Sequence, residues 1–160
     1  MPVGYAILVS IGTCVIAAAF EGACAGKNVK AFFAELKFPR FAAPFSLWTI
    51  IGGVYYLVFW FVLYRLLRLE SDSLPKTAAL ILIVFMMLVN GLANYVIFRA
   101  KNLWLSFVIG ALFPIMDIAL LVFLTQLDTV AALSLIPYLI YRVYGVWWGY
   151  ALWKVNAKER

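Results

Sequence analysis

Two charged residues interrupt long apolar stretches of this 160-residue sequence, and they are the first residues to consider for chemistry. Asp117 and Arg142 each stand among uncharged neighbours, where a charge is costly unless it is paired or functional. If two helices turn near Leu127, Asp117 lies ten residues before the turn and Arg142 fifteen after it. The offset is about 7.5 Å along a helix axis, which an arginine can bridge. The spacing predicts either a structural ion pair between them or an Arg142 that faces a cavity and pairs with an anionic ligand.

Two amides form a second polar group. Asn90 and Asn94 are separated by four residues, so they share one face of a helix. They can bond across helices for stability or present amides to a ligand, and the sequence leaves both interpretations open. Glu21, which closes the first apolar stretch, could act with Asp117 in a small ion-coupled transporter. That function has the least support, because the sequence contains no inverted repeat.

The residue inventory excludes several kinds of chemistry. Histidine is missing from the sequence, which excludes imidazole bases, His-bound metals and His-ligated haem. We therefore predict no metal site and assign no catalytic residue. Cys14 and Cys24 would be about 15 Å apart along one helix, too far for a disulfide within the chain. Packing inside a membrane explains both cysteines.

Aromatic side chains are abundant, with 6 Trp, 9 Tyr and 13 Phe. Many lie in the second and the last apolar stretches, where those that face inward would form a flat-sided apolar pocket with a few polar tips. These residues are Trp48, Tyr55, Tyr56, Tyr138, Tyr141, Tyr144, Trp147 and Trp148. Such a pocket suits a polycyclic ligand, and Trp48 is among the predicted ligand-binding residues.

The last apolar stretch carries two short patterns. Gly145 and Gly149 form a GxxxG, which permits close helix approach either in a dimer or within one bundle. Val146, Tyr150 and Lys154 match a pattern proposed for cholesterol contact, and their spacing puts them on one helical face.

The elements that hold these residues follow from composition. Hydrophobic residues make up 67% of the chain and charged residues 12%, against roughly 45–50% and about 25% in soluble domains. We predict an all-α, multi-pass membrane protein, a single domain over residues 1–160. Its five transmembrane helices are expected at about 3–24, 44–67, 76–98, 103–126 and 129–153. The first is expected to be retained, because no basic residue precedes it as in a signal peptide. The loop at 25–43 is a candidate lid.

Basic residues predict the orientation in the membrane. The N-terminal side carries three of them, and the side with the long loop and the C-terminus carries nine. The three are Arg65, Arg68 and Lys76; the nine are Lys27, Lys30, Lys37, Arg40, Arg99, Lys101, Lys154, Lys158 and Arg160. The long loop and the C-terminus are therefore expected in the cytoplasm, with the N-terminus outside. This topology explains the net charge of +6 without nucleic-acid binding.

Three stretches resemble one known family, the translocator proteins, also called tryptophan-rich sensory proteins (TspO/MBR) or peripheral benzodiazepine receptors. The strongest runs from Pro137-Tyr138 through Tyr144-Gly145 to Trp153-Lys154-Val155-Asn156. Asn90 through Phe98 is similar to the family's Asn-x-x-Trp-x-x-x-Phe-Phe stretch, and Pro39 through Pro44 to its proline-rich start of the second helix. The likeness covers residues from about 33 to 156.

The resemblance implies a five-helix bundle, usually a homodimer, with a pocket between helices beneath the first loop. It places Phe41 and Pro44 at the lid. Asn90, Tyr138, Tyr141 and Gly145 fall on pocket-lining positions, and Val146, Tyr150 and Lys154 fall in the sterol-motif region. We add Arg142 to the expected ligand-binding residues, with Lys37 as a second basic group for carboxylates.

The function implied is binding or transport of a hydrophobic planar ligand, such as a porphyrin (protoporphyrin or haem), a sterol or another lipid. No cofactor is required. The alternative is a light-dependent enzyme that degrades porphyrin in the same pocket. We do not expect that activity, because Gly52, Ala93 and Tyr141 stand where the resemblance predicts tryptophan.

Overall fold

Five long helices dominate the structure, a computed structural model that describes residues 1–70 and 72–157. Each is long and apolar enough to cross a membrane. They are α1 (Val3–Ala25), α3 (Phe45–Arg68), α4 (Leu74–Phe98), α5 (Leu103–Leu127) and α6 (Thr129–Ala157). The described residues contain no strand. The prediction of an all-α membrane bundle with five spans is confirmed.

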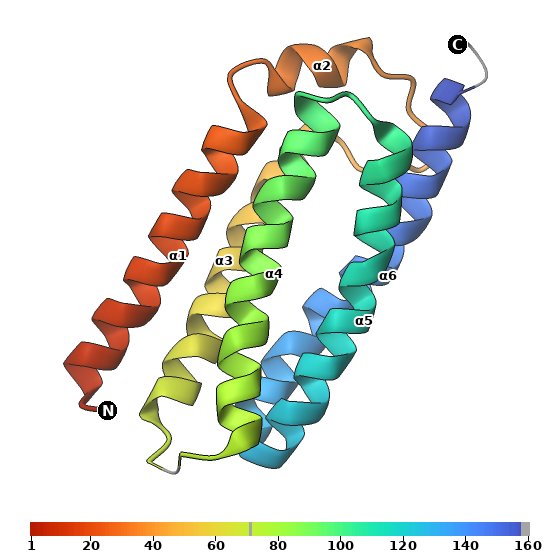
Figure 1. The fold of residues 1–160 in the computed structure, drawn as a ribbon. Helices are drawn as coiled ribbons and strands as arrows, with labels where there is room; N and C mark the ends of the chain where they lie inside the picture. The colour runs from red at the N-terminus through yellow and green to blue at the C-terminus, as the bar shows by residue number, and fades with distance from the viewer. Residues whose placement is uncertain (71, 158–160) are drawn as a thin grey trace.

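The five helices pack side by side in one bundle (Figure 1), and their contacts close a ring in the order α1, α3, α6, α5, α4. Helix α1 packs against α3 and α4, α6 packs against α3 and α5, and α4 packs against α5. Because the connections after α4 and after α5 are short, α4 and α5 are antiparallel neighbours, and so are α5 and α6. Apolar side chains cover the outside as well, Leu8 and Ile16 being 70% and 72% exposed. A surface of this kind suits lipid, where lipid-facing apolar side chains carry no penalty.

A sixth, short helix lies in the long connection that sequence reasoning described only as a loop. Helix α2 (Val29–Glu35) crosses one end of the ring (Figure 1). It forms because Phe32 and Phe33 are both buried against the bundle, which compensates for its short length. Helix α6 also continues to Ala157 rather than ending near residue 153.

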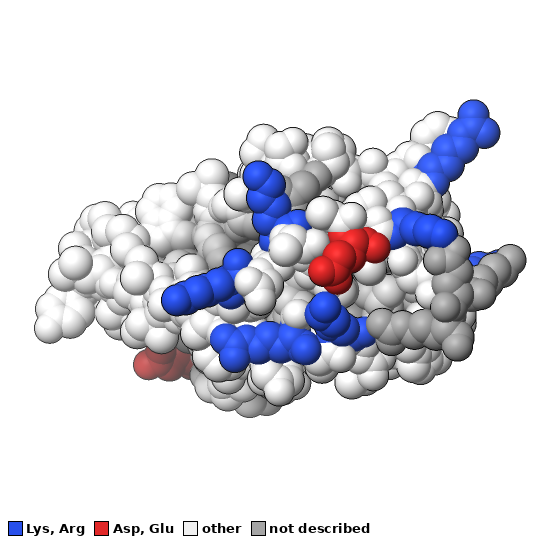
Figure 2. Space-filling view, turned by 90° about the horizontal axis from the view of Figure 1, so that it is seen from above, with Lys and Arg blue, Asp and Glu red and all other residues white. Residues whose placement is uncertain are grey.

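The end of the bundle covered by α2 is strongly basic. Figure 2, seen from above, shows several Lys and Arg side chains around an acidic group on this face. The exposed basic residues of these connections and of the end of α6 are Lys27, Lys30, Lys37, Arg40, Arg99, Lys101 and Lys154. Lys158 and Arg160, which were counted on the same side, lie outside the described residues.

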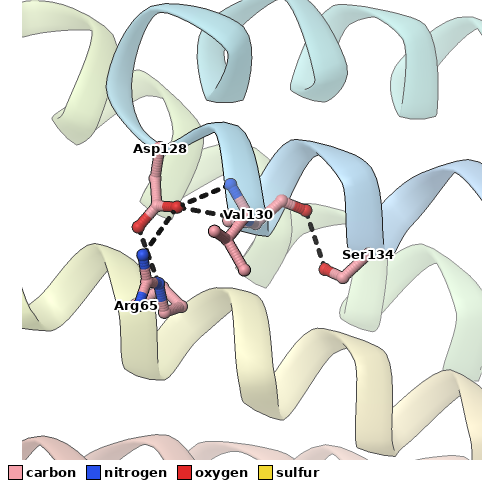
Figure 3. Close-up of polar contacts among 5 residues, drawn as sticks. Arg65, Asp128, Val130 and Ser134 are labelled. Carbon is pink, nitrogen blue, oxygen red and sulfur yellow. Dashed lines mark hydrogen bonds and ion pairs between the residues drawn. The ribbon is translucent and has the colours of Figure 1, made fainter.

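Asp128 fixes the opposite end, where α5 turns into α6 (Figure 3). Its Oδ1 accepts the amide N–H groups of Val130 and Ala131, both at 3.0 Å, and so caps the start of α6. The guanidinium of Arg65 on α3 adds a bidentate contact, with Nε to Oδ2 at 2.7 Å and Nη2 to Oδ1 at 3.0 Å. Burial alone would raise the pKa of Asp128, but the hydrogen bonds from Arg65 and the two amides hold it below its ordinary value.

This arrangement predicts a pH-dependent loss of stability. A lowered folded-state pKa means that the charged carboxylate stabilises the fold above the unfolded value of about 4, and the contribution disappears as the pH falls through the folded value. Asp128→Asn keeps a capping oxygen but loses the charge, and we expect it to cost about 1 kcal/mol at pH 7. Thermal unfolding in a non-ionic detergent at pH 7 and pH 3 measures this. The difference between wild type and variant should shrink below about pH 4; a constant difference would contradict the assignment.

Gly91 sets the approach of α1 to α4. A Cβ added there would lie 2.5 Å from two ring carbons of Phe20 on α1, so one side must move. We expect Gly91→Ala to lower the free energy of unfolding by about 1–3 kcal/mol. Gly12→Ala is the matched control, because a Cβ there meets nothing within 4 Å. It should be neutral or slightly stabilising. Thermal unfolding in detergent compares them, and equal effects of the two substitutions would show that Gly91 does not set this contact.

Candidate ligand-binding site

A cavity of about 460 Å³ lies inside the ring beneath α2, within the size range of small-molecule sites. Its walls come from α1, α2, α3, α4 and α6. A smaller cavity of about 170 Å³ adjoins it toward α5. Seven residues line both: Phe33, Trp48, Asn90, Asn94, Phe98, Tyr141 and Arg142. This shared wall makes the two cavities parts of one site.

Helix α2 forms the aromatic roof. The ring of Phe33 packs 5.7 Å from that of Phe98 on α4 and 6.5 Å from that of Trp48 on α3, centroid to centroid. Trp48 in turn packs 4.4 Å from Trp148 on α6. Side chains from four elements therefore meet at one end of the cavity.

The segment that carries α2 is tied to α6 at two points. The amide group of Asn156 accepts from the backbone N–H of Lys37 at 3.1 Å and donates to the carbonyl of Lys37 at 2.9 Å. The hydroxyl of Tyr144 donates to the carbonyl of Phe41 at 3.0 Å and accepts from the N–H of Ala43 at 3.2 Å. These bonds hold Phe41 in a left-handed conformation, φ 71°, that bulky residues rarely adopt.

The carboxylate of Glu21 accepts three hydrogen bonds on the wall between α1 and α4. Tyr56 donates to its Oε2 at 2.5 Å, Asn90 to the same oxygen at 2.9 Å, and Asn94 to Oε1 at 3.0 Å. We call these four residues the Glu21 cluster, and all four line the larger cavity. The two amides thus do share a helix face, and they use it to bind a carboxylate on another helix. Asp117 is not part of this cluster and lines neither cavity.

Arg142 lies on the wall formed by α6, and its side chain is 14% exposed. Its Cζ lies 4.0 Å from the ring centroid of Phe113, 4.9 Å from that of Tyr138 and 5.5 Å from that of Tyr55. Its Nε lies 3.8 Å from Oδ2 of Asp117, which is wholly buried. At this distance the two groups form an ion pair, but they are too far apart for a hydrogen bond. Stacking and charge, rather than hydrogen bonding, hold the guanidinium here.

Several buried polar atoms around the site have no hydrogen-bond partner among the described residues. The donors among them are Nε1 of Trp48 and of Trp148, the hydroxyls of Tyr55 and Tyr141, and Nε and Nη2 of Arg142; beside Arg142, both carboxylate oxygens of Asp117 also have no partner. Buried polar atoms are nearly always paired in folded proteins. Arginine and tryptophan side chains can only donate. The site therefore has donors that its own residues leave unused.

The predicted site residues divide into two groups. Those that line a cavity are Trp48, Asn90, Tyr138, Tyr141, Arg142 and Gly145. Phe41 and Pro44 line neither: the Phe41 side chain is 77% exposed, and Pro44 is the residue that precedes α3. The connection between α1 and α3 contributes to the cavity wall through Val29 and Phe33 of α2.

The sterol-type pattern lies away from both cavities. Val146, Tyr150 and Lys154 are absent from the described linings, and Lys154 Nζ lies 5.6 Å from the ring centroid of Tyr150. The GxxxG pattern faces inward, since a Cβ at Gly149 would meet Phe107 of α5 at 3.7 Å and Gly145 lines the smaller cavity. Within one chain, Gly149 packs α6 against α5, whereas a Cβ at Gly145 would meet nothing within 4 Å.

Sequence reasoning did not assign Glu21 or Phe33 to the binding site. A lone acid at the end of an apolar stretch, together with two amides on one helix face, was the available signal for Glu21. No comparable signal marked Phe33, because phenylalanine is common throughout the chain. Gly52 and Ala93, noted as departures from the family pattern, also line the larger and the smaller cavity respectively.

Comparison with known proteins agrees with this architecture. The sequence model of the TspO/MBR family matches residues 10–154, which is nearly the whole chain. No curated protein is similar enough to give a match. The matched range includes α2 to α5, most of α1 and of α6, and every residue of the shared cavity wall. The chain therefore belongs to the TspO/MBR family, and it is a multi-pass membrane protein of that ligand-binding and transport kind.

Proposed function

We propose that the protein binds a planar, largely apolar ligand of the tetrapyrrole type in the cavity beneath α2. The observation that carries this is the aromatic wall shared by both cavities, with Phe33, Trp48 and Tyr141 on three different helices. Flat rings favour stacked or edge-on contact with aromatic side chains. Unused donors at Trp48 and Tyr141 match the polar edge of such a ligand better than the single hydroxyl of a sterol.

A fluorescence titration tests this proposal. Purified protein in detergent is titrated with protoporphyrin, with haem as the comparison, and tryptophan quenching is followed. Saturable quenching is expected. Tyr141→Ala should weaken binding about tenfold, the loss of one stacked ring contact. Tyr150→Ala is the matched control, because Tyr150 lies on the same helix outside both cavities. Linear quenching, or equal effects of the two variants, would overturn the proposal.

We also propose that the basic end of the bundle faces the cytoplasm. Seven exposed basic residues of the described chain lie at the α2 end, and Arg65, Arg68 and Lys76 lie toward the other. Basic residues are retained on the cytoplasmic side during insertion. A C-terminal green fluorescent protein fusion should fluoresce, and a C-terminal alkaline phosphatase fusion should be inactive. The reverse pattern would invert the topology.

A homodimer is the assembly that the family likeness supports. Light scattering of the detergent-solubilised protein, corrected for bound detergent, should give twice the chain mass of 18.0 kDa. A mass equal to one chain would contradict a dimer.

A further inference from the structure

Arg142 has more hydrogen-bonding capacity than the folded chain uses. Its guanidinium is covered by the rings of Phe113 and Tyr138, so its N–H edge is the part free to bond. Yet Nε and Nη2 have no hydrogen-bond partner in the described chain, and neither carboxylate oxygen of Asp117 has one. Arginine and a carboxylate normally meet at 2.7–2.9 Å, against 3.8 Å here. Asp117 therefore balances the charge of Arg142 without saturating its donors.

The two partners differ in their access to the site. Arg142 lines both cavities, whereas Asp117 is wholly buried and lies outside both described linings. Arg142 thus borders the space open to a ligand, and Asp117 lies beside the guanidinium but outside that space. The nearby unused donors, Trp48 Nε1 and the hydroxyl of Tyr141, border the same cavities.

The other charged group of the larger cavity is already occupied. Both carboxylate oxygens of Glu21 accept hydrogen bonds from the Glu21 cluster. The groups of the cavity wall that still lack a partner are therefore hydrogen-bond donors, which need an acceptor. Because one of them is the charged guanidinium of Arg142, a negatively charged acceptor is the best match.

We propose that Arg142 recognises a carboxylate of the ligand, and that Asp117 is a resident counterion that weakens this recognition. The inference rests on the proposed function and narrows its ligand class to planar rings that carry an acid group. The ligand carboxylate binds the guanidinium edge of Arg142 that borders the cavities, while Nε stays beside Asp117. Asp117 stabilises the arginine when the site holds no acid, and its charge repels the incoming carboxylate.

Paired probes test this: protoporphyrin, which carries two carboxylates, and its dimethyl ester, which has the same ring without charge. Binding of each is measured by tryptophan quenching in one detergent for every variant. The quantity compared is the ratio of the ester Kd to the acid Kd, because partitioning into micelles is common to all variants. Wild type should prefer the acid.

Arg142→Gln should weaken acid binding about 10- to 100-fold, the loss of charge-assisted hydrogen bonds, and leave ester binding nearly unchanged. Asp117→Asn should tighten acid binding about tenfold. A gain of affinity cannot come from misfolding. The Asp117→Asn variant therefore tests the proposed roles of Arg142 and Asp117 even if Arg142→Gln folds poorly. Arg65→Gln is the control, because Arg65 lies outside both linings beside Asp128, and it should change neither Kd.

The outcomes separate the two proposals. If acid and ester both saturate with equal affinity in wild type and both variants, the tetrapyrrole site stands and the role of Arg142 is refuted. If neither probe saturates, the proposed function fails and this inference fails with it. Weaker acid binding in Asp117→Asn would refute the counterion role, because it would mean that Asp117 helps to hold the acid.

Discussion

Replacing Glu21 by leucine is expected to lower the free energy of unfolding by about 3 kcal/mol. The substitution removes the acceptor for Tyr56, Asn90 and Asn94, each within 3.0 Å of a carboxylate oxygen. A hydrogen bond to a charged group contributes roughly 1.5–3 kcal/mol, and three bonds to one carboxylate contribute less than their sum. The donors left behind line the larger cavity, which reduces the loss further. Thermal unfolding in detergent measures the effect.

Two further variants give this prediction its control. Glu21→Gln keeps one acceptor oxygen, but its amide nitrogen replaces the other oxygen and is a donor that faces other donors. We therefore expect it to lower the free energy of unfolding by about half as much as Glu21→Leu does. Glu35→Leu removes an exposed acid at the end of α2, where Lys101 lies 3.4 Å from the carboxylate. An exposed pair of this kind contributes about 0–1 kcal/mol. Equal stability of Glu21→Leu and Glu35→Leu would mean that the Glu21 cluster does not hold α1 to the bundle.

Gly53→Trp is expected to block the larger cavity and weaken protoporphyrin binding about 100-fold. Gly53 lines that cavity, and a Cβ built on it meets no atom within 4 Å. An indole at this position can therefore enter the cavity and occupy the space of a planar ligand. The fold should persist, because the added side chain fills a space rather than displacing a packed neighbour. The quenching titration gives the affinity, and circular dichroism checks that the helices remain.

The matched control places the same side chain outside the site. Gly12 lies on α1, lines neither described cavity, and likewise has no atom within 4 Å of an added Cβ. Gly12→Trp should bind protoporphyrin as the wild type does. If Gly53→Trp binds equally well with a saturable curve, the ligand does not occupy the larger cavity, and the aromatic wall is not the binding surface.

The amino-acid sequence determined the number and type of the long elements. A helix inside a membrane satisfies its own backbone hydrogen bonds, so a run of about 20 apolar residues is enough to predict one. Helical periodicity likewise placed Asn90 and Asn94 on one face, and both amides bond to Glu21 from that face. These are local properties, which depend only on neighbours in the sequence. The resemblance of residues 33–156 to the family could also be recognised from the sequence, because short motifs in a fixed order identify a family without any knowledge of contacts.

Only the tertiary structure decided which face of each helix turns inward. In a soluble helix the polar face marks the outside, but here the lipid-facing and core-facing residues are equally apolar, so the sequence gives little information on rotation. That is why the sequence could not tell that Tyr141 of α6 lines the cavities while Trp147 and Tyr150 of the same helix lie outside them. The partner of Asn90 is 69 residues away on α1. The order of the helices around the ring chose that partner, and that order is set by packing across the whole bundle.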